Sequence, residues 1–133
     1  MSKFVPIIVL IAAFLLVVSV AGCGMDFQKS TKLSLRYSLE SYQKALKSME
    51  RAQIRGRISP PAAMQIVEFE EGYRATHATA EELVKQWASL KEDDAGKEHL
   101  ERLEWEIRNY TALAARTAAE FVSFLKRLGI YSP

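Results

Sequence analysis

The 133-residue chain has one cysteine, Cys23, and only two histidines, His77 and His99. A disulfide within the chain would need a second cysteine, so none is expected. Thiolate and histidine–carboxylate metal sites need several ligands at defined spacings, and neither histidine follows a glutamate by three residues. We therefore expect neither a metal nor another cofactor.

Motifs that carry chemistry are also missing. The chain contains no Gly-x-Ser-x-Gly nucleophile motif and no glycine-rich phosphate loop. Its acidic clusters fall largely off the apolar positions, so we interpret them as a solvated, ion-paired face: Glu68, Glu70, Glu71, Glu98, Glu101 and Glu104. The net charge of +2 is too small to indicate a nucleic-acid partner. An enzyme is the least expected class.

One long apolar run is present, at the N-terminus. Residues 4–20 contain no charged side chain, and Lys3 precedes them. This pattern is typical of a secretory signal peptide. An uncleaved membrane anchor is the alternative, because the run is near the ~17-residue lower limit for a membrane-spanning helix.

The residues at the end of the run are Val20, Ala21, Gly22 and Cys23. They resemble the lipobox of bacterial lipoprotein precursors. The resemblance implies a signal peptide over 1–22, cleavage before Cys23, lipid on the Cys23 sulfur, and an acylated (palmitate-type) new amino terminus. Glycine rather than aspartate directly after the cysteine, at Gly24, resembles the lipoproteins that are sorted to the outer membrane. We expect a periplasmic protein anchored there by lipid, with the inner membrane as the alternative.

After a short tether over residues 23–29, apolar residues recur in alternating steps of three and four. This spacing indicates amphipathic helices that pack at shallow angles, as in coiled coils. No segment alternates with period two, so no strand is expected. The three predicted core stripes are Leu35, Leu39, Tyr42, Leu46, Met49; then Ala62, Ile66, Phe69, Tyr73, Thr76, Ala80, Leu83, Trp87, Leu90; then Leu100, Leu103, Ile107, Tyr110, Ala114, Thr117, Phe121, Phe124, Leu128.

Turn residues divide these stripes into three helices, at about 30–55, 60–91 and 95–128. Gly56 can end the first helix, Ser59 can cap the second, and Asp93 or Asp94 can cap the third. Short loops make successive helices antiparallel. The sequence predicts an all-α, up-down-up three-helix bundle over 30–133. Folding at the turns places Tyr42 beside Tyr73 and Phe69 beside Phe121.

Charge is unevenly distributed along the helical region. Residues 24–57 hold eight basic and three acidic residues, whereas residues 58–133 hold nine basic and thirteen acidic ones. The basic first helix can complement the acidic helices internally. Alternatively, Lys29, Lys32 and Arg36 can attract anionic lipid headgroups, each contributing up to ~1 kcal/mol near a membrane surface.

Trp105 falls off the predicted stripe of the third helix. It either contacts a partner or covers the edge of the bundle. A face of Leu113, Ala118, Val122 and Leu125 widens the same stripe and could seat another helix. The favoured hypothesis is a lipid-anchored interaction or scaffolding module that binds another envelope protein or itself. A helical carrier or sensor of a small apolar ligand is the alternative.

Overall fold

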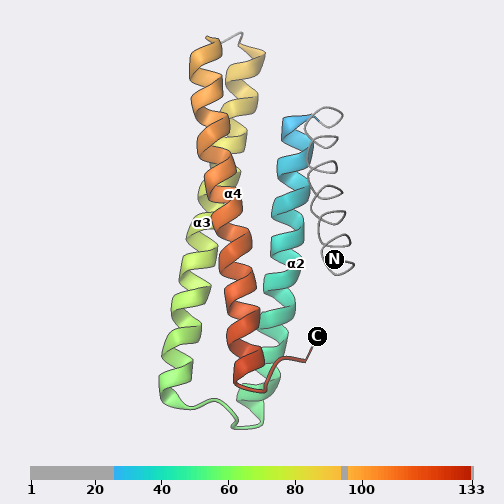
Figure 1. The fold of residues 1–133 in the computed structure, drawn as a ribbon, viewed down its shortest axis with the longest axis vertical. Helices are drawn as coiled ribbons and strands as arrows, with labels where there is room; N and C mark the ends of the chain where they lie inside the picture. The colour runs from blue at the N-terminus through green and yellow to red at the C-terminus, as the bar shows by residue number, and fades with distance from the viewer. Residues whose placement is uncertain (1–25, 94–95, 133) are drawn as a thin grey trace, which may run out of the picture. The chain divides into compact units, whose positions relative to one another are not determined.

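The computed structural model describes residues 26–93 and 96–132, and these residues form three helices and no strand. The helices are α2 (Phe27–Ile54), α3 (Pro60–Glu92) and α4 (Lys97–Arg127). Successive helices run in opposite directions, with the C-terminal tail beside the end of α2 (Figure 1). The expected all-α, antiparallel three-helix bundle is confirmed. The predicted lipobox, Val20 to Cys23, lies outside the described residues.

The chain divides into two units, Met1–Ser30 and Thr31–Pro133. The described part of the first unit is the start of α2. There the Ser30 backbone N–H donates to the Asp26 carbonyl at 3.0 Å, and Ser30 Oγ donates to the Phe27 carbonyl at 3.1 Å. Asp26 thus precedes the first turn, where a carboxylate complements the positive end of the helix dipole.

Glycine ends both α2 and α4 in the same way. Gly56 and Gly129 have φ angles of 66° and 70°, the left-handed region that other residues rarely adopt. The Arg57 N–H donates to the Ala52 carbonyl at 2.9 Å, and the Ile130 N–H donates to the Leu125 carbonyl at 3.1 Å. These are the 6→1 bonds of Schellman motifs.

The start of α3 follows the prediction, but the start of α4 does not. The Ser59 hydroxyl accepts the Ala62 N–H, and prolines follow it in the first turn. The predicted aspartate cap of the third helix is wrong. Gly96 occupies the N-cap of α4 without a side-chain hydrogen bond, and Asp93 instead forms the C-cap of α3. The reason is that α3 continues to Glu92, so Asp93 belongs to the end of α3.

Aromatic rings join α2 to the other two helices. The Tyr42 ring stacks on Tyr73, with centroids 4.1 Å apart, and lies 6.0 Å from Phe121. Phe69 stacks on Phe121 at 5.6 Å. Both predicted pairings, Tyr42 with Tyr73 and Phe69 with Phe121, are confirmed. Since α3 and α4 approach each other more closely than either approaches α2, large rings bridge the wider spacing.

The buried face of α2 differs from the predicted stripe. Leu39 and Leu46, predicted in the core, are only half-buried, whereas Ser38 and Ala45 are buried. The shift runs along the helix, whose buried residues are Thr31, Leu35, Ser38, Tyr42, Ala45, Ser48 and Ala52. Apart from Leu35, the buried face therefore combines small residues with tyrosine. Hydropathy alone favoured the leucines, but the tyrosine rings already fill the space and leave room only for small neighbours.

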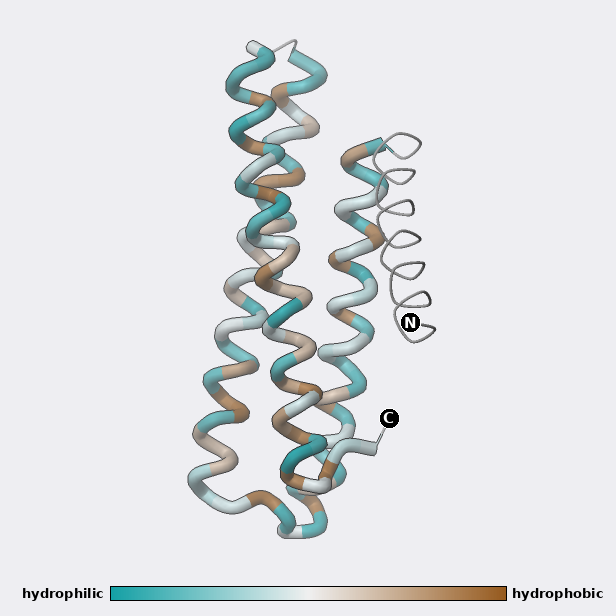
Figure 2. Tube along the Cα trace, in the orientation of Figure 1, coloured by the Kyte–Doolittle hydropathy of each residue, from teal (hydrophilic) through white to brown (hydrophobic). Residues whose placement is uncertain are grey.

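Each described helix contains both hydrophobic and hydrophilic residues along its length. Figure 2 shows hydrophilic and hydrophobic residues interspersed along α2, α3 and α4. None of the described helices has an apolar stretch of the length and hydropathy needed to cross a bilayer. Each helix instead buries one face and leaves the other exposed.

Candidate functional site

The predicted basic residues at the start of α2 are all exposed. Arg36 Nε lies 3.3 Å from Glu40 Oε1, one turn later in the same helix. Exposed pairs of this kind contribute only about 0.3–0.5 kcal/mol. Such a weak pair leaves Arg36 accessible to a partner. Lys32 is also accessible at the surface, and so is Lys29 in the first unit, Met1–Ser30.

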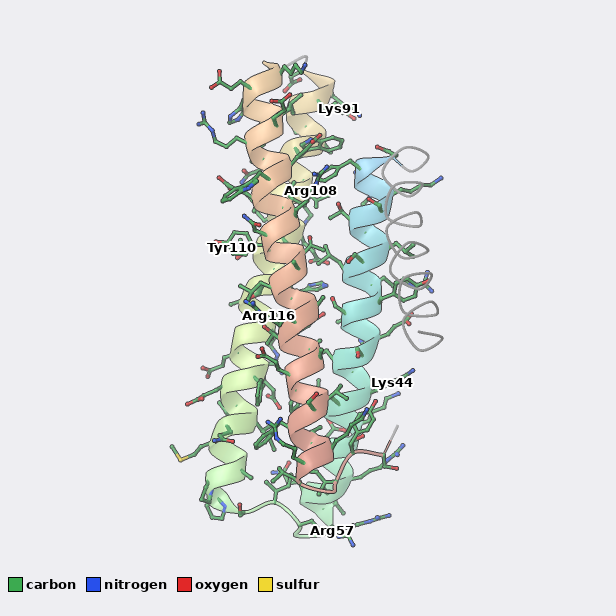
Figure 3. All side chains as sticks on the ribbon, viewed as in Figure 1. Lys44, Arg57, Lys91, Arg108, Tyr110 and Arg116 are labelled. Carbon is green, nitrogen blue, oxygen red and sulfur yellow. The ribbon has the colours of Figure 1, made fainter. Side chains whose placement is uncertain are left out.

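Trp105 has 66% of its surface exposed, in contrast to the buried Trp87. This exposure leaves most of the Trp105 ring available for contact with a partner. Tyr110 was predicted in the core and is 38% exposed, because the buried face of α4 passes through Thr111 instead. Leu128, also predicted in the core, is 42% exposed just beyond the helix. In Figure 3, Tyr110 projects from α4 on the side away from α2.

Trp105 and Tyr110 border a shallow hollow on α4. Its lining residues are Trp105, Glu106, Asn109, Tyr110 and Leu113. The other four residues follow Trp105 by one, four, five and eight positions, which places all five on one side of the helix. Two of the five are aromatic and one is leucine. An open apolar hollow on an otherwise charged helix is typical of a contact surface.

A second hollow lies between α3 and α4. Its lining residues are Gln65, Glu68 and Phe69 from α3, and Thr117, Phe124 and Arg127 from α4. Leu113 of the first hollow and Thr117 of the second are one turn apart, and Thr117 Oγ1 donates to the Leu113 carbonyl at 2.9 Å. The two hollows therefore follow one flank of α4, and we call the pair of them, with the α3 residues that line the second, the α3–α4 groove.

Helical periodicity extends the α3 side of this groove beyond Phe69 to Gly72, Thr76 and Thr79. Thr76 Oγ1 donates to the Gly72 carbonyl at 2.7 Å, and Thr79 Oγ1 donates to the Ala75 carbonyl at 2.9 Å. These hydroxyls are satisfied within their own helix, as expected for mid-helix threonines. The α3 side of the groove therefore has its free polar groups at Gln65 and Glu68 rather than at these threonines.

The widened stripe predicted for the third helix does not form one face. Ala118 and Leu125 are fully buried in the core and Val122 packs against it, whereas Leu113 lines the groove. In a helix, residues 113 and 118 are five positions apart and diverge by about 140°. The groove itself was not predicted, although the spacing of Tyr110, Leu113 and Thr117 was a signal for it.

The core contains a polar layer centred on Tyr73. Ser38 Oγ donates to the Leu35 carbonyl at 2.9 Å and lies 3.2 Å from the Tyr73 hydroxyl, which therefore donates to it. Burial raises the pKa of Tyr73. The His77 ring lies 5.5 Å from the Tyr73 ring, and His77 Nδ1 is 3.8 Å from Glu81 Oε1. Of these contacts, the one between Ser38 and Tyr73 joins α2 to α3 and fixes the register of these two helices.

Tyr42 forms the other half of this layer. Burial raises its pKa, and the positive charge of Arg74 opposes the rise. Its buried hydroxyl has no well-formed hydrogen bond among the described residues. Of the described histidines, carboxylates and cysteines, no three are placed to hold a metal ion. The layer is a packing feature with two neutral phenols.

Comparison of the chain with protein-family models, curated proteins and solved structures found no match. Functional interpretation therefore depends on the residues themselves. Of the predicted site residues, the structure places Trp105 in a hollow and leaves Lys32 and Arg36 on the surface of α2. It adds Tyr110 and Leu113 to the lining of that hollow, and helical periodicity puts Gly72 on the α3 side of the groove.

Proposed function

We propose that this protein is a lipid-anchored component of the bacterial cell envelope that binds a helix of another envelope protein in its α3–α4 groove. The N-terminal sequence supports the anchor, through the resemblance of Val20 to Cys23 to a lipobox. The exposed Trp105 beside Tyr110 and Leu113 is the observation that carries the binding function. Tryptophan and tyrosine are enriched among residues that dominate binding energy at interfaces.

Gly72 supports a helix as the occupant of the groove. A glycine in a helix interior costs roughly 0.5–1 kcal/mol relative to alanine. A Cβ added at Gly72 would meet nothing within 4 Å, so packing inside this chain does not require the glycine. A neighbouring helix that approaches α3 closely would require it. Gly72 would then be required for binding the partner helix and not for folding of this chain.

Charge and anchoring favour a different protein over a second copy. In a parallel pair related by a two-fold axis along the groove, Glu68, Glu106 and Arg127 would each face their own twin, and like charges repel. In an antiparallel pair, the two lipid anchors would lie at opposite ends of the complex. A partner helix with basic residues opposite Glu68 and Glu106 avoids both costs.

The proposed location is the periplasmic face of the outer membrane, with the inner membrane as the alternative. A single lipid chain binds membranes only marginally, whereas several chains anchor stably. Exposed Lys32 and Arg36, with Lys29, can add attraction to anionic headgroups. Cys23→Ala should abolish incorporation of labelled palmitate, and continued labelling would refute the anchor.

Photo-crosslinking in intact cells tests the groove. A photoreactive amino acid at Asn109, which lines the groove, should give an adduct with one other protein. The same residue at Gln53, exposed on α2, is the matched control and should not give that adduct. Trp105→Ala should remove the adduct while helix content is unchanged. Adducts of the chain with itself alone, or none at Asn109, would contradict the proposal.

Gly72→Leu separates binding from folding. The side chain enters open space, so the free energy of unfolding should stay the same or rise. Loss of the Asn109 adduct is expected because the leucine occupies the path of the partner helix. Ala78→Leu on an exposed position of the same helix is the control and should keep the adduct. An adduct that survives Gly72→Leu would exclude close helix packing at this site.

A further inference from the structure

A pocket unrelated to the groove lies where α2 and the C-terminal tail meet. Its volume is about 290 Å³. The residues that line it are Ser48, Arg51, Ala52, Arg55, Arg57, Gly129, Ile130, Tyr131 and Ser132. Three of them are arginines and none is acidic. This volume lies at the lower end of the range for ligand sites, so the pocket fits only a small ligand.

The two Schellman motifs build this pocket. Gly56 turns the chain after α2, which brings Arg57 back beside the helix end, and Gly129 turns the tail after α4. Figure 3 shows Arg57 in the connection that follows α2. Ser48 then fixes the tail, since its Oγ donates to the Ser132 carbonyl at 2.8 Å and accepts the Ser132 N–H at 3.0 Å.

The charge in the pocket is largely uncompensated. Arg51 Nη1 donates to the Ser132 carbonyl at 3.2 Å, which leaves its other N–H groups available. Arg55 and Arg57 are exposed and form no ion pair with a described residue. The C-terminal ends of α2 and α4 each carry roughly half a negative charge, which offsets only part of the three positive charges. Three guanidinium groups thus line one small concavity.

We propose that this arginine pocket binds a dianionic oxyanion of the phosphate class, either free or as a small phosphate monoester. Guanidinium groups bind phosphate through paired N–H donors, which fits its geometry better than a single ammonium does. Three cations match a dianion better than a monoanionic carboxylate. The site lies on different residues from the groove, so it does not depend on the proposed helix partner.

Isothermal titration calorimetry of the full chain in detergent, with inorganic phosphate as the titrant, tests the site. Saturable binding is expected, with acetate binding at least about tenfold more weakly. Glucose 6-phosphate in a parallel titration distinguishes a monoester from the free ion. Arg55→Gln/Arg57→Gln should weaken phosphate binding about tenfold or more, because each lost contact is a hydrogen bond between charged groups.

Matched controls remove the same charge elsewhere. Arg116→Gln and Lys44→Gln change exposed cations outside the pocket, labelled in Figure 3, and should alter phosphate affinity by less than about twofold. Arg55→Lys/Arg57→Lys keeps the charge and should bind with intermediate affinity. Absence of saturable binding below about 10 mM, equal losses in the controls, or equal binding of acetate would each overturn the proposal.

Discussion

The rings of Tyr42 and Tyr73 stack with centroids 4.1 Å apart and an interplanar angle of 19°, yet their hydroxyl groups have different surroundings. The Tyr73 hydroxyl is hydrogen-bonded to Ser38, whereas that of Tyr42 is buried without a well-formed partner. A buried polar group without a partner costs about 1–3 kcal/mol. We therefore expect these two chemically identical side chains to make different polar contributions to stability.

Phenylalanine substitutions should separate these contributions. Tyr73→Phe is expected to lower the free energy of unfolding by about 1 kcal/mol, because it removes one hydrogen bond while keeping the ring. Tyr42→Phe should be neutral or stabilise the protein by up to about 1 kcal/mol, because it removes a hydroxyl that costs desolvation. Urea denaturation of the two variants measures both values. A loss in Tyr42→Phe as large as that in Tyr73→Phe would show that Arg74 satisfies the hydroxyl.

Alkaline pH should weaken the fold through the same two residues. Burial raises the pKa of both phenols above their ordinary value of 10.0. The unfolded chain therefore loses these protons first, and the free energy of unfolding falls as pH rises above that value. Below it, both states keep the protons and these residues add no pH dependence. The wild-type protein should show a steeper decline than Tyr42→Phe/Tyr73→Phe in denaturation curves between pH 9 and about 11.

Ser48 should control the order of the C-terminal tail. Its hydroxyl makes two hydrogen bonds to the Ser132 backbone, so Ser48→Ala should cost about 1–2 kcal/mol of stability. Amide exchange at Ser132 should accelerate in the same variant. Ser123→Ala, at an exposed serine of α4, is the control and should stay within about 0.5 kcal/mol. Unchanged exchange at Ser132 would mean that other contacts hold the tail.

The register of α2 can be tested at two adjacent positions. Ala45 is fully buried, so Ala45→Leu should overpack the core and cost about 1–3 kcal/mol. Leu46 is half-buried, so Leu46→Ala should cost less than the ~2–5 kcal/mol of a core leucine. Thermal unfolding monitored by circular dichroism gives both values. The reverse order would support the stripe that hydropathy predicted.

The three helices and their order could be predicted from local features of the amino-acid sequence. Gly56, with Pro60 and Pro61, imposes a turn because backbone conformation at these residue types is local. The aromatic layers followed from folding the chain at such turns, which is why Phe69 beside Phe121 was predictable. Composition and the region near Cys23 indicated the anchor without any reference to the fold.

Which small residues are buried and which surfaces stay open depends on how the helices pack in three dimensions. Serine and alanine carry weak hydropathy signals, so the burial of Ser38 and Ala45 depends on the tyrosine rings opposite them. The arginine pocket joins Arg51 to Ser132, 81 positions along the chain. No local pattern encodes such a pairing, because it arises only when two helix ends meet in space.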